Sequence, residues 1–314
     1  MKKWIGCLLM IIILTICSIY IFIPAKIVIS RIITSTVSIN GEYRNIRAEE
    51  QWEKWWRDAG GQPHSKGEPF KFRGSVYSIS KIDHNAVGIE MENDGEKIQT
   101  IMHLVSFKLD STGTIWECEV PAGNNLLNRI WAYKKAQEIR KNMDGILRNL
   151  SSFLSFPKNI YQLSIFKTSI HDTTMLSGKF TSATYPTIPE IYGYFEVINK
   201  SILKQKGKST GYPLVYVRMV DSGQFETQVA LPTSHILKND GELFYRRMVP
   251  GNFLCTEVRG GTFNVSEGMK QLEFFLRDNN KTIMAIPFEQ WITNRIQVPD
   301  SSKWLTRIYI PVVE

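Results

Sequence analysis

The sequence predicts an α+β protein in which two folded units follow one apolar N-terminal helix, and three observations lead to this prediction. Residues 4–23 form an apolar run, an alternating apolar pattern leads into a long amphipathic helix, and a strand-helix-strand-strand pattern occurs twice after residue 160. The length of 314 residues suits two domains of about 150 residues each. With 43% hydrophobic and 22% charged residues, the chain has the composition of a packed protein and not of a disordered one.

Charge and cysteine content exclude several classes of protein. The formal net charge of +8 is spread thinly along the chain and identifies no partner. Four cysteines are too few for a disulfide scaffold, and none of them has the short spacing of a zinc or redox site. The sequence contains no glycine-rich phosphate loop and no recognisable nucleophile-histidine pairing. We therefore expect no cofactor and no metal.

The N-terminal run Trp4 to Ile23 contains no charge, proline or polar amide. As a helix it would span about 30 Å, the thickness of a hydrocarbon core. The run reaches Pro24 without the small-residue pair of a cleavage site, which predicts a transmembrane anchor over 4–23 instead of a removed signal peptide. Lys2 and Lys3 favour a cytoplasmic N-terminus, so we expect a single-pass membrane protein whose folded part is non-cytoplasmic (periplasmic).

The first folded unit is expected over 27–156. It opens with an alternating strand and a helical stretch that places Trp52, Trp55 and Trp56 on one face. These indoles are expected to close one end of a core or cavity, with stacking on a ligand as the alternative. Further strands are predicted over 70–81, 86–92, 97–109 and 112–120, and a long amphipathic helix over 126–154.

This order of elements, the Trp52–Trp56 cluster and the strand Trp116-Glu-Cys-Glu-Val-Pro-Ala resemble the START-like superfamily, also called SRPBCC or polyketide cyclase-like. The resemblance covers 27–156. It implies a helix-grip fold, in which a curved antiparallel sheet holds a long C-terminal helix around an apolar cavity, and a second, apolar ligand in that cavity. The matching residues contain no catalytic signature, so the resemblance concerns the fold.

The second half of the chain contains an internal repeat, and we expect a domain boundary at 157–159. Thr227 lies five residues before Pro232, and Thr306 lies five residues before Pro311, so the two copies end alike. Two half-sheets that face each other leave a cleft at a pseudo-twofold axis, where pockets are common. The first copy is a strand ending near residue 183, a helix over 190–204 and strands over 214–220 and 225–231; the second has a strand over 253–258, a helix over 265–277 and strands over 282–291 and 304–310.

The segment Pro287-Phe288-Glu289-Gln290-Trp291 and the terminal strand from Trp304 to Val312 resemble the GyrI-like effector-binding domain, the small-molecule sensor module of AraC-type and multidrug-responsive regulators. The resemblance covers 160–314 and implies a ligand pocket with Glu289 at its centre and Trp304 and Tyr192 as pocket aromatics. Gln290-Trp291 stands where a hydrophobic-tyrosine pair is commoner, and this departure bears on which ligand is preferred. Trp291 is also a candidate ligand-binding residue. The chain has no helix-turn-helix segment, and direct nucleic-acid binding is not expected.

The chemistry of Glu289 supports the same assignment without the family. On a strand, its carboxylate points to the face opposite Phe288. If that face lines the cleft, a cationic or hydrogen-bond-donating ligand best offsets the cost of burying the charge. Aromatic neighbours would add a cation–π attraction of about 0.5 to 2 kcal/mol. The alternative is a solvent-facing strand residue.

Three functions follow from these observations. The favoured one is a membrane-anchored small-molecule binding or sensor protein with an apolar or cationic aromatic ligand. The second is a hydrolase of electrophilic small molecules in which Glu289 acts as general base or nucleophile. The third is an interaction protein with vestigial pockets. Binding is favoured because the sequence contains no recognisable catalytic motif.

Overall fold

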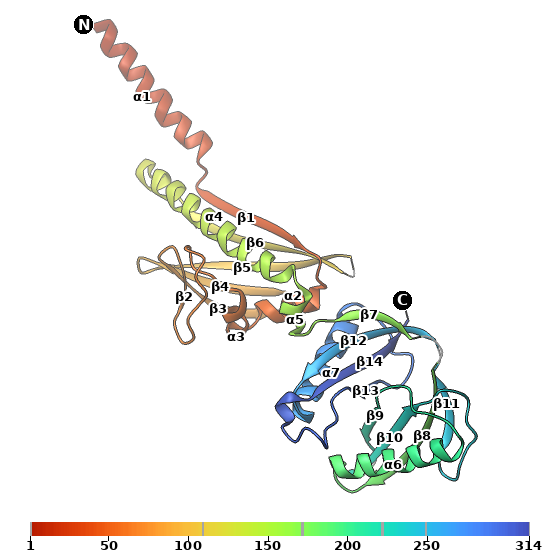
Figure 1. The fold of residues 1–314 in the computed structure, drawn as a ribbon. Helices are drawn as coiled ribbons and strands as arrows, with labels where there is room; N and C mark the ends of the chain where they lie inside the picture. Colours follow the sequence, from red (N-terminus) through yellow and green to blue (C-terminus); the bar gives the residue numbers. More distant parts are fainter. Residues whose placement is uncertain (1, 109, 171–172, 221–222, 249, 314) are drawn as a thin grey trace. The chain divides into compact units, whose positions relative to one another are not determined.

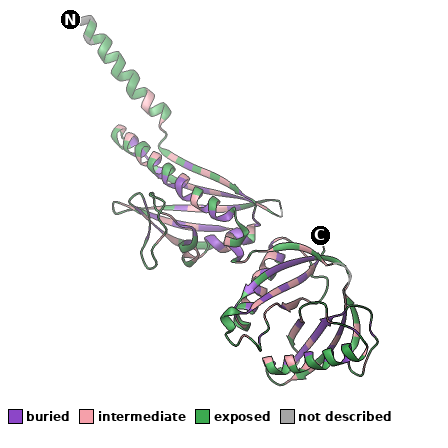
Figure 2. Cartoon of the chain, in the orientation of Figure 1, coloured by how far each residue is buried: buried purple, intermediate pink, exposed green. Residues whose placement is uncertain are grey.

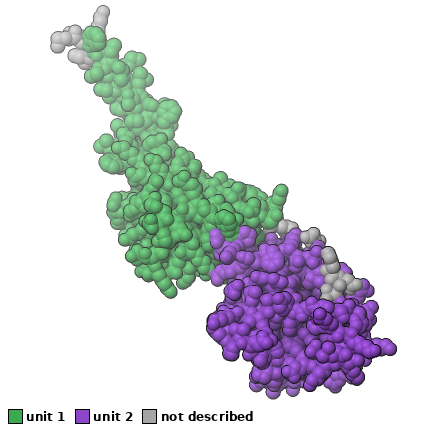
Figure 3. Space-filling view, viewed as in Figure 1, with its two compact units in different colours: residues 1–156 green, residues 157–314 purple. Residues whose placement is uncertain are grey.

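The computed structural model describes residues 2–108, 110–170, 173–220, 223–248 and 250–313 (Figure 1). The chain divides into two compact units, Met1–Phe156 and Pro157–Glu314 (Figure 3). Each unit contains an antiparallel sheet and helices, so the predicted α+β class is confirmed.

The N-terminal run forms the helix α1 (Lys2–Phe22). A membrane span must combine sufficient length with sustained apolar character. Among the residues that the structure describes, no helix combines the two. The single-pass membrane localisation predicted from residues 4–23 is therefore wrong, and the expected periplasmic placement falls with it.

The first unit is built on a six-stranded sheet in the order β1-β6-β5-β4-β3-β2, with every neighbouring pair antiparallel. The single strand expected over 70–81 is two strands, because Arg73 (φ 47°) and Gly74 (φ 83°) form a two-residue turn with positive φ at both positions. The strands are β1 (Lys26–Ser35), β2 (Phe70–Phe72), β3 (Ser75–Asp83), β4 (Ala86–Asn93), β5 (Glu96–Lys108) and β6 (Ser111–Pro121).

Three helices complete this unit: α2 (Ile39–Ile46), α3 (Glu49–Trp55) and α4 (Leu126–Leu154). The bounds of α4 confirm the long helix expected over 126–154. It begins where the side chain of Asn125 accepts a hydrogen bond from the backbone N–H of Leu127. Its buried stripe faces the sheet, and Figure 2 shows buried residues on both sides of this contact. The START-like family stays a prediction.

The three clustered tryptophans lie in the core. Trp52 and Trp56 stack with ring centroids 5.3 Å apart, and Phe70 meets both edge to face. Each indole N–H donates to a backbone carbonyl: Trp52 to Ile46, Trp55 to Asn45 and Trp56 to Lys71. Since the rings are buried and their polar atoms are satisfied, they fill the core and leave no free face for a ligand.

The second unit is built on an eight-stranded antiparallel sheet in the order β11-β8-β10-β9-β13-β14-β12-β7. Corresponding strands of the two copies lie at equal distances from the centre, where β9 pairs with β13. The elements are α5 (Pro157–Tyr161), β7 (Phe166–Ile170), β8 (Thr173–Ser182), α6 (Ile188–Lys204), β9 (Leu214–Met219), β10 (Phe225–Pro232), β11 (Phe244–Met248), β12 (Gly251–Arg259), α7 (Thr262–Asp278), β13 (Phe288–Trp291), the 3-10 helix η2 (Ser301–Lys303) and β14 (Leu305–Val312).

Each copy has one strand more than the sequence predicts, and this strand pairs with the other copy. β7 precedes the first copy but pairs with β12 of the second, and β11 precedes the second copy but pairs with β8 of the first. The predicted strand over 282–291 is also shorter than expected. Pro287 has no N–H to contribute to the ladder, and β13 begins at the next residue.

The first prediction concerns Gly145, on the face of α4 that packs against the Phe72 ring. A Cβ at this position would overlap that buried ring. Alanine would gain about 1 kcal/mol of helix propensity, whereas overpacking costs about 1 to 3 kcal/mol. We therefore expect Gly145→Ala to lower the free energy of unfolding by up to about 2 kcal/mol, as measured by urea unfolding of the full chain.

The double variant Gly145→Ala with Phe72→Leu tests the cause, because the smaller side chain leaves room for the added methyl group. The cost of the alanine should fall by more than half in the Phe72→Leu background. A stabilising effect of Gly145→Ala alone would contradict the packing described here.

Candidate functional site

Glu289 lies at the seam between the two copies of the second unit. On β13, it pairs with Val215 of β9 on one side and with Ile308 of β14 on the other. Val215 belongs to the apolar cluster under α6, and Ile308 to the cluster under α7. Glu289 is therefore on the helix-covered face of the sheet, between the two clusters, while Phe288 stacks on Tyr309 on the other face.

Two groups contact the carboxylate of Glu289. The indole N–H of Trp291, two residues along the same strand face, donates to Oε2 at 2.9 Å. The guanidinium of Arg295 approaches the same oxygen at 3.7 Å, which is an ion pair beyond hydrogen-bond distance. The Glu289 side chain is only 16% exposed. A buried acid is thus held between an indole donor and an internal cation.

Arg295 occupies an aromatic cage. Its guanidinium lies 3.6 Å from the ring centroid of Trp291 and 4.8 Å from that of Trp304. One terminal nitrogen donates to Oγ1 of Thr306 at 2.7 Å, whereas the buried Nε has no hydrogen-bond partner. With a side chain only 3% exposed, Arg295 is a desolvated cation that relies on the two rings and on Glu289.

Two tyrosines complete the cluster. Tyr192, from α6, accepts a hydrogen bond from the backbone N–H of Arg295 at 2.8 Å, and its ring lies 5.9 Å from that of Trp291. Tyr185 precedes α6, packs edge to face on Phe225 and remains 43% exposed. The helix that carries Tyr192 begins at a capping box formed by Thr187 and Glu190, which fixes the path of the chain between the two tyrosines.

The electrostatics of the cluster follow from burial and from the charge pair. Desolvation raises the pKa of Glu289, although Trp291 and Arg295 oppose the shift. Desolvation likewise lowers the pKa of Arg295, against the opposing effect of Glu289. The surrounding protein and the negative charge of Glu289 raise the pKa of Tyr185 to about 12. Burial thus favours the protonated form of Glu289, and a positive charge beside the carboxyl group opposes that shift.

The four site residues predicted from the sequence all contact one further residue, Arg295. Arg295 contacts Glu289, Trp291 and Trp304 by side chain and Tyr192 by backbone. Trp304 immediately precedes β14 instead of lying within it, and its indole N–H donates to the carbonyl of Val298. Sequence reasoning missed Arg295 and Tyr185. Both lie in connections, and only the three-dimensional contacts reveal their roles.

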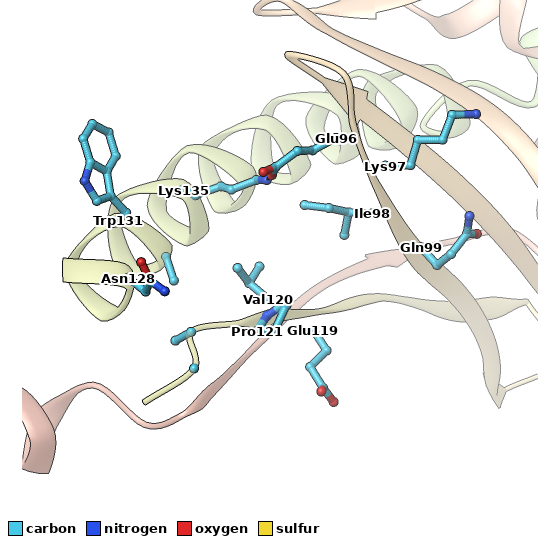
Figure 4. Close-up of a pocket in the computed structure, with 13 residues that line it drawn as sticks. Glu96, Lys97, Ile98, Gln99, Glu119, Val120, Pro121, Asn128, Trp131 and Lys135 are labelled. Carbon is cyan, nitrogen blue, oxygen red and sulfur yellow. The ribbon is translucent and has the colours of Figure 1, made fainter. Parts of the chain in front are cut away.

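The first unit contains a separate cavity of about 950 Å³ between the start of β5, the end of β6 and the N-terminal part of α4 (Figure 4). Ile98 and Val120 line it from the sheet, and Trp131, 69% exposed, lies on the helix side. Lys135 reaches from α4 to Glu96 of β5 in an ion pair. The lining therefore combines apolar side chains with charged ones.

A second buried carboxylate, Glu42, lies in the core of the first unit and differs from Glu289. The hydroxyl groups of Ser35 and Thr114 donate to its two oxygens, and the residue is fully buried. Burial raises its pKa. Because hydroxyl donors already occupy both oxygens inside a closed core, Glu42 is structural.

Comparison with known proteins yields similarity in structure only. No family model matches the sequence, and no curated protein matches it. The EcmrR C-terminal domain is 15% identical, with 48% of this chain and 98% of that chain covered and a TM-score of 0.43. SAV2435 bound to tetraphenylphosphonium is 14% identical (48% and 94%, TM-score 0.33), and a hydrolase from Listeria innocua is 8% identical (48% and 92%, TM-score 0.38). At TM-scores below 0.5, these similarities carry no argument about this chain.

The second prediction concerns the pH dependence of stability. The pKa of Glu289 in the folded protein lies above its ordinary value of 4.5. The contribution of this group to the free energy of unfolding is therefore fully present at low pH, and it is lost as the pH rises from 4.5 through the folded pKa. We expect the free energy of unfolding of the wild type, relative to Glu289→Gln, to fall over this window in urea titrations. Glu257→Gln, at an exposed glutamate of the same sheet, is the control. A difference that rises with pH would contradict the assignment.

Proposed function

We propose that the second unit binds a small-molecule cation at Glu289, with Trp291, Trp304 and Tyr192 as the aromatic residues of the site. One observation carries the proposal: Glu289 and two indoles already surround a guanidinium at the seam of the duplicated sheet. The seam is where a GyrI-like domain would hold its effector, as the sequence motif around Glu289 implies. The function is that of a ligand-binding or sensor module.

The energetics favour a cation over a neutral ligand. A carboxylate that lies between two apolar clusters has lost most of its hydration, and an ion pair with the ligand would compensate part of that loss. Each indole ring that the ligand contacts would add about 0.5 to 2 kcal/mol of cation–π attraction. A neutral molecule of the same shape would make the same packing contacts, but it would form neither the ion pair nor the cation–π interactions.

Hydrolysis of an electrophilic small molecule is the second candidate. It is favoured by the raised pKa of Glu289, which suits a general base. Against it, Oε2 of Glu289 already accepts from Trp291 and faces Arg295, so a reacting water would have to use the other oxygen. Turnover of an aryl ester or epoxide that disappears in Glu289→Gln would support hydrolysis, and saturable binding without turnover supports the sensor module.

We also propose that the cavity of the first unit holds a second, amphipathic ligand. The 950 Å³ volume is within the size of a drug-like ligand site, and the apolar Ile98 and Val120 face it. The charged side chains of Glu96 and Lys135 favour a ligand with a polar end, whereas the sequence led us to expect a purely apolar ligand.

The third prediction tests the cation site with benzamidinium, benzyltrimethylammonium and neutral benzamide as probes. Glu289→Gln should weaken the binding of at least one cation by tenfold or more, since a charge-assisted contact contributes about 1.5 to 3 kcal/mol. Benzamide should change by less than twofold. Isothermal titration calorimetry measures both, and the exposed Glu257→Gln is again the matched control. Equal losses for cation and benzamide would point to packing, and no binding of either cation by the wild type would contradict the proposed function.

The fourth prediction tests the cavity with the neutral fluorescent probe N-phenyl-1-naphthylamine. Ile98→Trp would fill the lined space and should weaken probe binding at least tenfold. Ile82→Trp adds the same bulk at an exposed position of β3 and should leave binding unchanged. Equal binding by the two variants would mean that the probe does not enter this cavity.

A further inference from the structure

The cation site described above is already occupied by a residue of the chain itself. We infer that Arg295 is a tethered substitute for the ligand, and that the ligand is a planar cation of the guanidinium or amidinium class that takes its place. This inference rests on the proposed function and adds the chemical class of the ligand and the way it enters.

Arg295 is bound less completely than a structural arginine. A buried guanidinium normally forms parallel hydrogen bonds to a carboxylate through its planar fork. Here the nearest carboxylate oxygen is 3.7 Å away, and the buried Nε has no hydrogen-bond partner. A buried charge with unmet hydrogen bonds costs free energy. A ligand that satisfies Glu289 more fully can therefore displace it.

The cage has the shape of a flat cation. The two indole centroids lie 3.6 and 4.8 Å from the guanidinium carbon, and Oγ1 of Thr306 accepts one of its N–H groups. A planar, delocalised cation can stack on both rings while its N–H groups point toward Glu289 and Thr306. A quaternary ammonium group has no N–H to donate to Glu289 or Thr306.

The segment that carries Arg295 contributes no residue to the two apolar clusters. Among residues 292–303, all of which the structure describes, Arg295 is the single buried one. At the start of the segment, the N–H groups of Ile292 and Thr293 donate to the carbonyl of Leu305, and the Leu305 N–H donates to Oγ1 of Thr293. Further along, the segment is held by bonds from the backbone N–H of Arg295 to Tyr192, from the Arg295 side chain to Thr306, and from the Trp304 indole to the Val298 carbonyl. The matching connection of the first copy, residues 220–224, is much shorter than residues 292–304.

The fifth prediction compares the affinity of benzamidinium with that of benzyltrimethylammonium in the wild type and in Arg295→Met. Removing a competitor increases the fraction of open sites, so Arg295→Met should bind benzamidinium at least tenfold more tightly. In Arg295→Met, benzamidinium should also bind at least tenfold more tightly than the tetrahedral cation, which has no N–H to donate to Glu289 or Thr306. Arg295→Lys retains a tethered cation without the planar group, and its gain should lie between those of the wild type and Arg295→Met.

The outcomes separate this inference from the proposed function. Equal affinities of the two cations for Arg295→Met would mean that the site does not select a planar N–H donor, which overturns the inference but leaves the Glu289 site intact. Unchanged or weaker benzamidinium binding by a folded Arg295→Met would overturn it as well. If neither cation binds to the wild type, the proposed function itself fails.

A measurement on the unmodified protein covers the case in which Arg295→Met does not fold. Saturating benzamidinium should speed hydrogen exchange of the backbone amide of Arg295, because displacement breaks its bond to Tyr192. The amides of β14 serve as the internal reference. Slower or unchanged exchange at Arg295, with benzamidinium bound, would overturn the displacement.

Discussion

The pairing of β9 with β13 is the contact on which the second unit depends. Glu289 and Gln290 of β13 lie opposite Val215 and Leu214, and the N–H of Trp291 donates to the carbonyl of Pro213. This short ladder joins two four-stranded halves into one sheet and brings the cluster under α6 beside the cluster under α7. The ionisable side chain of Glu289 therefore lies between two apolar clusters without being a member of either. Its desolvation, and with it the charge chemistry of the site, follows from that position.

Much of the fold was predictable, because local patterns determine it. The apolar stripe of α4 predicted a helix over 126–154, and the structure reproduces these bounds. The strand over 70–81 was predicted as one because Arg73, the first residue of its turn, gives no signal of its own. β7 and β11 were missed because they are short and pair with strands of the other copy, a constraint that no local window contains.

The site was predictable only in part, for a similar reason. Glu289 and Trp291 are two residues apart on one strand face, so their proximity follows from the period of a strand. The sequence also suggested a cation for Glu289, but not that the chain supplies one. Arg295 lies in a polar connection where an arginine is ordinarily solvated, and its burial comes from contacts with α6 and with Trp304. Long-range packing, and not residue type, decides its environment.

The exchange of leading strands between the two copies bears on the origin of the second unit. A chain with one copy alone would have its first strand extended away from its own half-sheet, with its pairing edge unsatisfied. Two such chains would satisfy each other by swapping these arms about a twofold axis. The present unit thus has the connectivity of an arm-swapped homodimer fused into one polypeptide. Because both halves lie in one polypeptide, they can differ in sequence, and the connection after β13 places Arg295 against Tyr192 of the other half.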